Sequence, residues 1–351
     1  MRLFLLPLSW LYQLILGVRH FIYDKKIIKP ATFDLPVICV GNLSFGGTGK
    51  TPHIEYLVRL LSNDFKTAVL SRGYGRLSKG FIIAKPGMTY RDIGDESMQY
   101  FQKFKHITVA VDEKRARGIK QLIATAENPE LILLDDAFQH RRVKAGLNIL
   151  LTDFHNLYPN DFLFPAGRLR DITSAADRAD IIIVTKTPKV FSPFTRRRLT
   201  EIIKPKAHQS LYFSYIKYDS LTPLADHTNL AIPRKTTTIM LFCGIANPYP
   251  LQDFLQKKCT DLITIDFPDH HIFSKKDMHR VVNEFKNILG KNKIMVTTEK
   301  DAMRLVDSPY FSLFKNIPLF YVPIEVKFHE SEQLNYNSQV IDYVRKVTTN
   351  D

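Results

Sequence analysis

One short loop constrains the fold of this 351-residue chain more than any other feature. It reads Ser44-Phe45-Gly46-Gly47-Thr48-Gly49-Lys50-Thr51 and stands between an apolar, β-like run at 35–40 and a stretch with helical spacing at 52–62. Glycines allow backbone N–H groups to turn inward around phosphate oxygens, and the N-terminus of the following helix adds partial positive charge. Lys50 is expected to bridge the β- and γ-phosphates of a nucleotide, and the Thr51 hydroxyl to bind Mg²⁺. Ser44 replaces the first glycine of the common pattern, but the strand–loop–helix context still predicts a phosphate-binding loop.

A second motif supplies the acidic partner that a nucleotide-bound metal ion needs. Residues 131–134 are apolar, and Asp135 and Asp136 follow them directly. Successive side chains of a strand point to opposite sides, so one carboxylate is available to Mg²⁺ and the other to a separate contact. Together the two motifs predict a site for a nucleoside triphosphate and Mg²⁺.

The order of the remaining segments predicts the fold class. β-like runs recur at 67–70, 107–111, 148–151 and 180–184, and helical stretches such as 114–126 separate several of them. Strands that alternate with helices form a parallel sheet covered on both faces. We therefore expect an α/β protein whose main part, residues 26–220, is a P-loop NTPase-type domain with a parallel sheet.

A second, smaller α/β domain is expected over residues 221–351, including its linker. Prolines at 223 and 233 interrupt any helix in this linker. Beyond it, β-like runs at 237–242, 262–265 and 293–297 accompany a helical stretch at 275–289.

Residues 1–25 form a region of their own. The chain is apolar from Leu3 to Val18 except for Ser9 and Gln13, and basic residues follow from Arg19 onward. The run is shorter than the roughly 20 apolar residues of a spanning helix, and no small-residue cleavage site follows it. A helix lying in the interface of an anionic membrane is favoured over a buried core helix, a signal peptide or a membrane span.

The charge balance narrows the class of partner. Lys and Arg number 49 against 35 Asp and Glu, a net charge of +14, which favours an anionic partner: nucleic acid, nucleotide or acidic lipid. Basic residues are spread along the chain and no nucleic-acid recognition module occurs, so a nucleic acid is not expected. The three cysteines are too few for a disulfide framework or a zinc site, and no obligate protein partner is evident.

Several classes of nucleotide-binding protein share these two motifs. Partitioning ATPases carry a lysine just before the paired glycines, where this chain has Phe45. The guanine-binding motif of GTPases ends in an aspartate, and the segment Thr185-Lys186-Thr187 is followed by Pro188 instead. A membrane-associated nucleotide switch or partitioning-type ATPase therefore remains the alternative to a kinase.

Motifs along nearly the whole chain resemble the tetraacyldisaccharide 4′-kinase family of the lipid A pathway. They are Leu6-Pro7-Leu8-Ser9-Trp10-Leu11-Tyr12, Val40-Gly41-Asn42-Leu43, Ser71-Arg72-Gly73-Tyr74-Gly75, Gly94-Asp95-Glu96, Asp135-Asp136-Ala137-Phe138-Gln139-His140, Pro165-Ala166-Gly167-Arg168-Leu169-Arg170, Asp269-His270 and Thr298-Glu299-Lys300-Asp301-Ala302. The resemblance implies that ATP phosphorylates the 4′-hydroxyl of a tetraacyl disaccharide 1-phosphate, giving lipid IVA at the cytoplasmic face of the bacterial inner membrane. Ala137 and Asp171 depart from the glycine and glutamate common in the family.

The resemblance also assigns roles to individual residues. A sugar hydroxyl is a poor nucleophile and needs a base to take its proton; Asp95 is the candidate base, and His270 resembles its orienting partner. If the two pair, the active site lies between the two domains. Lys50 is the third catalytic candidate. The residues expected to bind the glycolipid are Arg72, Tyr74, Arg115, Gln139, His140, Arg168, Arg170 and Asp171. Arginine suits this role because its guanidinium group binds phosphate through two parallel hydrogen bonds.

Overall fold

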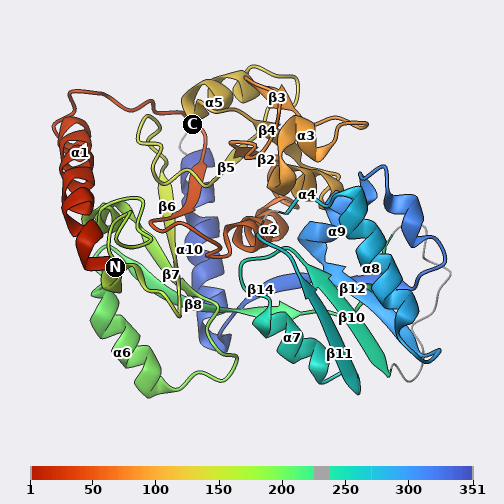
Figure 1. Ribbon diagram of the computed structural model, residues 1–351. Coiled ribbons are helices and arrows are strands. Elements are labelled where there is room, and N and C mark those ends of the chain that lie inside the picture. Colours follow the sequence, from red (N-terminus) through yellow and green to blue (C-terminus); the bar gives the residue numbers. More distant parts are fainter. Residues whose placement is uncertain (1, 225–236, 270, 350–351) are drawn as a thin grey trace. The chain divides into compact units, whose positions relative to one another are not determined.

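The computed structural model describes residues 2–224, 237–269 and 271–349, which divide into two compact units (Figure 1). Unit 1 comprises Met1–Ile216 and Val326–Asp351, and unit 2 comprises Lys217–Glu325. Each unit is built on a sheet whose strand pairs are mainly parallel. The expected α/β class with a P-loop NTPase-type sheet is therefore confirmed.

The sheet of unit 1 has the strand order β14-β8-β7-β6-β1-β5-β2-β4-β3. Its strands are β1 (Val37–Asn42), β2 (Thr67–Ser71), β3 (Ile82–Ile83), β4 (Thr108–Val111), β5 (Leu131–Asp135), β6 (Leu147–Asp153), β7 (Ile181–Thr185), β8 (Ser210–Tyr218) and β14 (Ile324–Phe328). The chain order reverses at β1, which pairs in parallel with both β5 and β6. Ligands of such sheets bind at the carboxyl ends of the strands beside this reversal.

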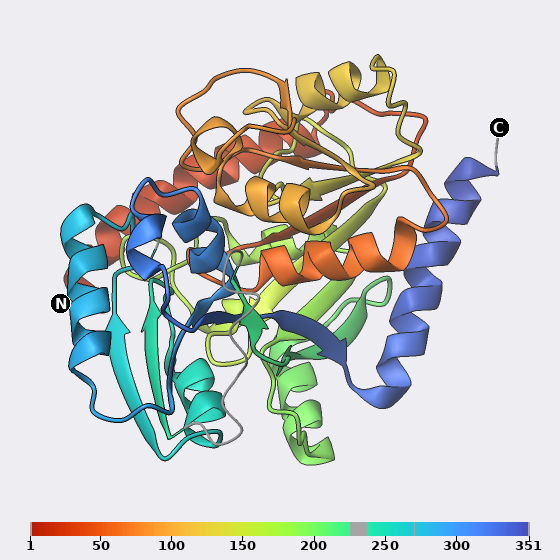
Figure 2. The same cartoon turned by 90° about the vertical axis from the view of Figure 1, so that its right-hand side faces the viewer.

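Helices cover both faces of this sheet, as its continuous apolar strands require. They are α1 (Leu6–Asp24), α2 (Lys50–Leu61), α3 (Tyr90–Ile93), α4 (Asp95–Lys103), α5 (Arg115–Ile123), α6 (Pro193–Ile203) and α10 (Glu330–Thr348), with short 3₁₀ turns at Arg2–Leu5, Tyr158–Asn160 and Thr173–Arg178. One core cluster joins α2, α4 and α10, and the other joins α1, α5 and α6. Figure 2 shows α2 in orange and α10 in blue on their shared side of the sheet.

The last residues of the chain differ from the expected domain boundary. Residues 326–351 were assigned to the smaller domain, but they belong to unit 1. The reason is burial of apolar surface. β14 lies beside β8 at the edge of the sheet, and α10 buries Tyr336, Val340 and Val344 in the same core cluster as the apolar side chains of α2. The chain therefore passes into unit 2 at the end of β8 and returns to unit 1 within β14.

Unit 2 has a smaller sheet with the order β11-β10-β12-β13-β9. The strands are β9 (Thr222–Pro223), β10 (Thr238–Cys243), β11 (Asp261–Asp266), β12 (Lys293–Thr298) and β13 (Leu319–Val322), and the helices are α7 (Tyr249–Gln256), α8 (Lys275–Asn287) and α9 (Glu299–Val306), with a 3₁₀ turn at Phe311–Phe314. The β-like runs and the helix expected here are observed. Part of the expected linker, including Pro233, lies outside the described residues.

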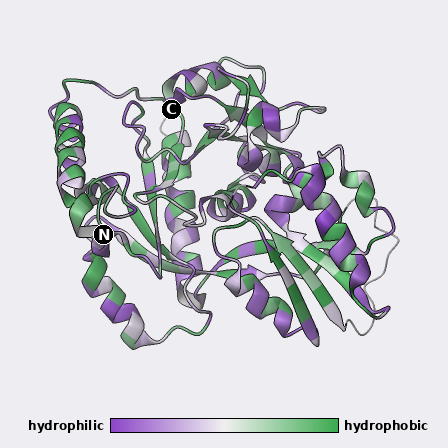
Figure 3. Cartoon of the chain, in the orientation of Figure 1, coloured by the Kyte–Doolittle hydropathy of each residue, from purple (hydrophilic) through white to green (hydrophobic). Residues whose placement is uncertain are grey.

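Helix α1 has two unlike faces. Ser9, Leu16 and His20 are buried against the rest of unit 1, whereas many of the apolar side chains of this helix are exposed. Green, the colour of hydrophobic residues, alternates with purple along α1 in Figure 3. The exposed side chains of the helix are Leu8, Trp10, Leu11, Leu14, Ile15, Val18 and Phe21, each more than half exposed, and Phe4 of the preceding 3₁₀ turn is exposed as well. In the described part of the chain no helix combines the length and hydropathy needed to span a bilayer.

Candidate active site

The phosphate loop follows β1, as expected, and side chains from neighbouring segments hold it. Asn42, the last residue of β1, donates from Nδ2 to Thr48 Oγ1 at 2.9 Å. The hydroxyl of Thr185, the last residue of β7, donates to the Thr48 carbonyl at 2.9 Å, and Nζ of the next residue, Lys186, donates to the Gly47 carbonyl. The loop thus has fixed contacts on both sides, which prepares its backbone N–H groups for phosphate.

Asp135 lies at the end of β5, directly beside the phosphate-loop strand, because Val40 of β1 is its register partner. The side chain is buried, and Oδ2 accepts a hydrogen bond from the buried Tyr100 hydroxyl at 3.2 Å. Burial, together with the negative charges of Asp136 and Glu96, raises the pKa of Asp135 to about 7. Burial and the two neighbouring carboxylates therefore outweigh the positive charges of Lys50 and Arg115, and the ionised form of Asp135 would gain from a bound cation.

Asp136 follows with a left-handed backbone, φ 47°, which turns its carboxylate back toward the phosphate loop. Lys50 Nζ lies 3.7 Å from Oδ1, and the Arg170 guanidinium donates to both carboxylate oxygens. Burial alone would raise the pKa of Asp136, but the positive charges of Lys50 and Arg170 outweigh it and lower the pKa to about 2. The paired aspartates thus have opposite environments. Asp135 has a raised pKa and no ion pair with a cationic side chain among the described residues, whereas Asp136 pairs with both Lys50 and Arg170.

Mg²⁺ fits this arrangement. Asp135 Oδ1 is buried and accepts no hydrogen bond from the described residues, so a lone pair is open to a cation. Thr51, in the first turn of α2, carries the second candidate ligand. Within the described ranges, no group of three or more His, Cys, Asp and Glu side chains is arranged to hold a metal ion. Phosphate oxygens and water would complete the shell, as is usual for Mg²⁺.

The candidate base Asp95 is the first residue of α4 and is half-buried. Gly94 precedes it with φ +86°, and a Cβ built on Gly94 would lie 2.8 Å from the Tyr74 carbonyl oxygen. Only glycine permits this approach, which brings the start of α4 against the turn after β2. That turn carries Arg72 and Tyr74, both exposed, so three predicted site residues share one corner of unit 1.

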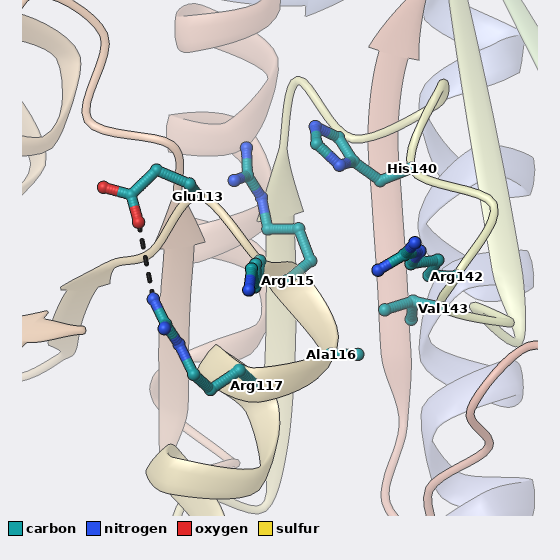
Figure 4. Close-up of a pocket in the computed structure, with 8 residues that line it drawn as sticks. Glu113, Arg115, Ala116, Arg117, His140, Arg142 and Val143 are labelled. Atoms are coloured by element: carbon teal, nitrogen blue, oxygen red, sulfur yellow. Dashed lines mark hydrogen bonds and ion pairs between the residues drawn. The ribbon is translucent and has the colours of Figure 1, made fainter. Parts of the chain in front are cut away.

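A cavity of about 320 Å³ is mainly cationic (Figure 4). Arg72 is close enough to two of its lining residues, Arg115 and His140, to act on both electrostatically. Its lining residues are Glu113, Lys114, Arg115, Ala116, Arg117, His140, Arg142 and Val143. Arg115 is buried and donates to the carbonyls of Asp112 at 2.6 Å and Asp135 at 3.0 Å. Burial and the nearby charges of Arg115 and Arg72 lower the pKa of His140 to about 4, so the imidazole is neutral at pH 7. The cavity is suited to an anionic group.

The segment 168–171 contributes differently from expectation. Arg168 is exposed, and its backbone carbonyl accepts a hydrogen bond from Phe45 N at 2.7 Å. Arg170 bonds Asp136 and Asn42 inside the nucleotide site. Asp171, expected to bind the glycolipid, is 1% exposed, and its Oδ1 lies 2.6 Å from His20 Nε2. A carboxylate buried in this contact does not face a ligand, so the structure places Asp171 in the interior.

Gln139 and His270 complete the predicted set. Gln139 donates from Nε2 to the Asn42 carbonyl at 2.8 Å and thereby touches the strand that leads into the phosphate loop. His270, and with it the expected pair with Asp95, lies outside the described residues. In unit 2, two residues of the motif Thr298–Ala302 stabilise the start of α9: Thr298 Oγ1 accepts from Asp301 N, and Asp301 Oδ2 accepts from Gly244 N at 2.9 Å.

Four further residues of the site were not found from the sequence. Tyr100 contacts Asp135, and Asn42 and Lys186 hold the phosphate loop. Glu55, 1% exposed, accepts from Gln99 and pairs with Lys103, joining α2 to α4. The sequence offered a signal for Glu55 alone: it is a charged residue among the apolar positions of the helical stretch 52–62, and charged residues are rarely buried unless paired.

Known proteins share this fold and this sequence. The profile of the family described as Tetraacyldisaccharide-1-P 4′-kinase matches residues 1–341. Curated tetraacyldisaccharide 4′-kinases of Bacteroides thetaiotaomicron and Flavobacterium johnsoniae are each 43% identical to this chain; the alignments cover 99% of it and 94% and 98% of the relatives. A crystal structure of LpxK from Aquifex aeolicus, described as an "apo" form in complex with ATP, matches with a TM-score of 0.72 at 28% identity, covering 97% of this chain and 99% of that one.

Proposed function

The chain belongs to the tetraacyldisaccharide-1-phosphate 4′-kinase family, and from this membership we propose that it transfers the γ-phosphoryl group of ATP to the 4′-hydroxyl of a tetraacyl disaccharide 1-phosphate. The product would be lipid IVA, an intermediate of lipid A biosynthesis. The observation that carries the proposal is the arrangement of Lys50, Asp135 and Asp136 at the adjoining ends of β1 and β5. Phosphoryl transfer depends mainly on positioning and charge neutralisation, and this group supplies both.

Each residue of the nucleotide site has a role in this reaction. The backbone of residues 44–49 would cradle the phosphates, and Lys50 would bind the β- and γ-phosphates. Thr51 and Asp135 would hold Mg²⁺, whose charge neutralises the phosphate oxygens. Asp136 keeps Lys50 and Arg170 in place, since it contacts both cations. Arg170 thereby fixes the geometry from which Lys50 reaches the nucleotide.

Asp95 would accept the proton of the attacking hydroxyl. Its support is the position at the start of α4, because Tyr100 of the same helix contacts Asp135. One rigid helix therefore carries both the candidate base and a partner of the metal-binding carboxylate. We further propose that His270 orients Asp95, a role that rests on the family resemblance of Asp269-His270.

The cationic cavity is the proposed site for a phosphate of the glycolipid. Arg115 and His140 line it, together with Arg142. Arg72 and Tyr74, at the neighbouring turn, and Arg168 would contact the sugar or phosphate, and Gln139 connects the cavity to β1. The exposed apolar face of α1 would lie in the cytoplasmic face of the inner membrane, from which the acyl chains are presented.

The cavity proposal predicts a change in His140. A bound sugar 1-phosphate should raise the pKa of His140 from about 4 toward its ordinary value of 6.5, because a nearby anion favours imidazolium and offsets the repulsion from Arg115 and Arg72. The measurement is a histidine-selective NMR titration at several concentrations of the ligand. The unphosphorylated sugar is the control and should leave the pKa unchanged. An unaltered titration with saturating sugar phosphate would place the phosphate elsewhere.

One assay tests the reaction itself. Wild-type protein, Mg²⁺, γ-labelled ATP and the tetraacyl disaccharide 1-phosphate are incubated in detergent micelles, and label is sought in the lipid. We expect labelled lipid, and no label when the acceptor lacks the 4′-hydroxyl. ATP hydrolysis without lipid labelling would instead favour the membrane-associated switch or partitioning-type ATPase.

A further inference from the structure

We propose that α1 is a positioning element of the active site in addition to any role at the membrane. Tyr12 and His20, on its inward side, hold segment 168–171, and Arg170 of that segment holds the phosphate loop and Asp136. The two side chains are positioning residues, since neither touches the nucleotide site. The turnover readout of this inference rests on the proposed kinase function.

The first step is the contact between α1 and segment 168–171. The Tyr12 hydroxyl donates to the Arg170 carbonyl at 3.1 Å, and His20 Nε2 lies 2.6 Å from Asp171 Oδ1. His20 and Asp171 are 8% and 1% exposed at their side chains, so water does not compete for this contact. Two successive residues of the segment are therefore tied to one helix, through backbone and side chain respectively.

The hydrogen-bond partners of His20 also determine its tautomer, that is, which ring nitrogen carries the hydrogen. Arg141 Nη1 lies 2.8 Å from His20 Nδ1, and a guanidinium group can only donate. Nδ1 is therefore the acceptor, and Nε2 carries the hydrogen that is donated to Asp171. Arg141 also pairs with Asp24 at the end of α1, at 2.5 Å. The histidine is held from both sides in one orientation.

The second step leads from the segment to the nucleotide site. Arg170 donates to both oxygens of Asp136, and to Asn42 Oδ1 at 2.5 Å. Asn42 in turn donates to Thr48 of the phosphate loop, and Asp136 faces Lys50. A shift of Arg170 would therefore disturb the loop and Lys50 together.

A parallel contact strengthens the assignment. Arg19, next to His20, donates from Nη2 to the Gln139 carbonyl at 2.5 Å, and Gln139 donates to the Asn42 carbonyl. Ser9 is buried on the same side of α1, where its hydroxyl donates to the Leu163 carbonyl at 2.9 Å and accepts from Ala166 N at 3.1 Å. A helix that served only as an anchor would not need four polar side chains directed into unit 1.

The test separates the inward side chains from the outward face. His20→Ala should lower kcat in micelles by about 10-fold or more, the usual size of losing a residue that orients a functional group, and should weaken MgATP binding. Its binding to vesicles of equal parts phosphatidylcholine and phosphatidylglycerol should equal that of wild type. Phe21→Ala, on the adjacent outward position, should lower vesicle binding while MgATP affinity stays at the wild-type value.

Conservative variants guard against simple misfolding. His20→Gln retains a donor near the position of Nε2 and should recover much of kcat, whereas Tyr12→Phe, which removes one hydroxyl, should lower kcat with an unchanged melting temperature. Gln13→Ala, on an exposed polar neighbour of Tyr12, is the matched control and should keep wild-type turnover. Wild-type kcat and MgATP affinity in both His20→Ala and Tyr12→Phe would overturn the inference.

MgATP binding is measured without lipid, so a failure of the kinase proposal can be told apart from a failure of the proposed positioning role of α1. If wild-type protein labels no lipid while His20→Ala still weakens MgATP binding, the kinase proposal is wrong and the positioning role stands.

Discussion

Asp95→Asn should lower kcat for lipid phosphorylation by about 10²–10⁴-fold, the usual contribution of a general base. The substitution keeps the size of the side chain and removes the ability to take a proton. Affinity for MgATP should stay near the wild-type value, because the phosphate loop, Lys50 and Asp135 are unchanged. Single-turnover lipid phosphorylation measures the first quantity, and equilibrium titration with MgATP measures the second.

Asp92→Asn is the matched control for Asp95. Asp92 lies three residues earlier, and its carboxylate caps α3 by accepting from Thr89 N at 2.8 Å, a role that an asparagine oxygen can also fill. Turnover of this variant should be close to that of wild type. His270→Ala should resemble Asp95→Asn, with a loss in turnover far larger than the loss in ATP affinity. Wild-type turnover in both Asp95→Asn and His270→Ala would contradict the proposed roles.

Lys50→Ala should have the second large effect, a loss of about 10²–10³-fold in kcat, which is typical for removing one preorganised donor to developing charge. MgATP affinity should fall as well, because Lys50 would bind the phosphates in the ground state too. A second measurement on the same variant reports directly on the ion pair between Lys50 and Asp136. Without the Lys50 charge, the pKa of Asp136 should rise above its value of about 2, which NMR of the carboxyl carbons can follow.

Lys66→Ala is the control for this experiment. Lys66 is an exposed lysine beyond the far end of α2, and removing its charge should leave kcat unchanged. If Lys50→Ala retained wild-type kcat, the loop would not serve phosphoryl transfer. If kcat fell but the pKa of Asp136 did not move, the ion pair between Lys50 and Asp136 would be absent in solution.

The strand segments that alternate with helices along the chain, and the phosphate loop, could be predicted because their determinants are local. The five residues of β7 are apolar or β-branched and fully buried, and a strand covered on both faces needs such a run. Asp135 and Asp136 were predicted as a pair because they end an apolar strand. The residues next to them in the sequence, however, do not distinguish their environments. The cations that pair with Asp136, Lys50 and Arg170, lie 86 and 34 residues away from it in the chain.

Two differences from expectation have the same origin. The sequence of α10 resembles any amphipathic helix, and only the packing of Tyr336 and Val340 against the core of unit 1 decides which domain it joins. Asp171 follows Arg170 in a motif that looks uniformly ligand-binding. The backbone turns one side chain toward Asp136 and the other into the interior beside His20.

By itself, the sequence determined the class of fold, the nucleotide loop, the acidic pair and the family, because each depends on residues that are close together in the chain. The tertiary structure decided which groups share a charge environment. It gives Asp135 a buried, uncompensated carboxylate and Asp136 two cations, keeps His140 neutral beside Arg115, and ties α1 to Arg170. Electrostatic energies depend on the distance between charges and on their burial. Neither quantity can be read from the spacing of residues along the sequence.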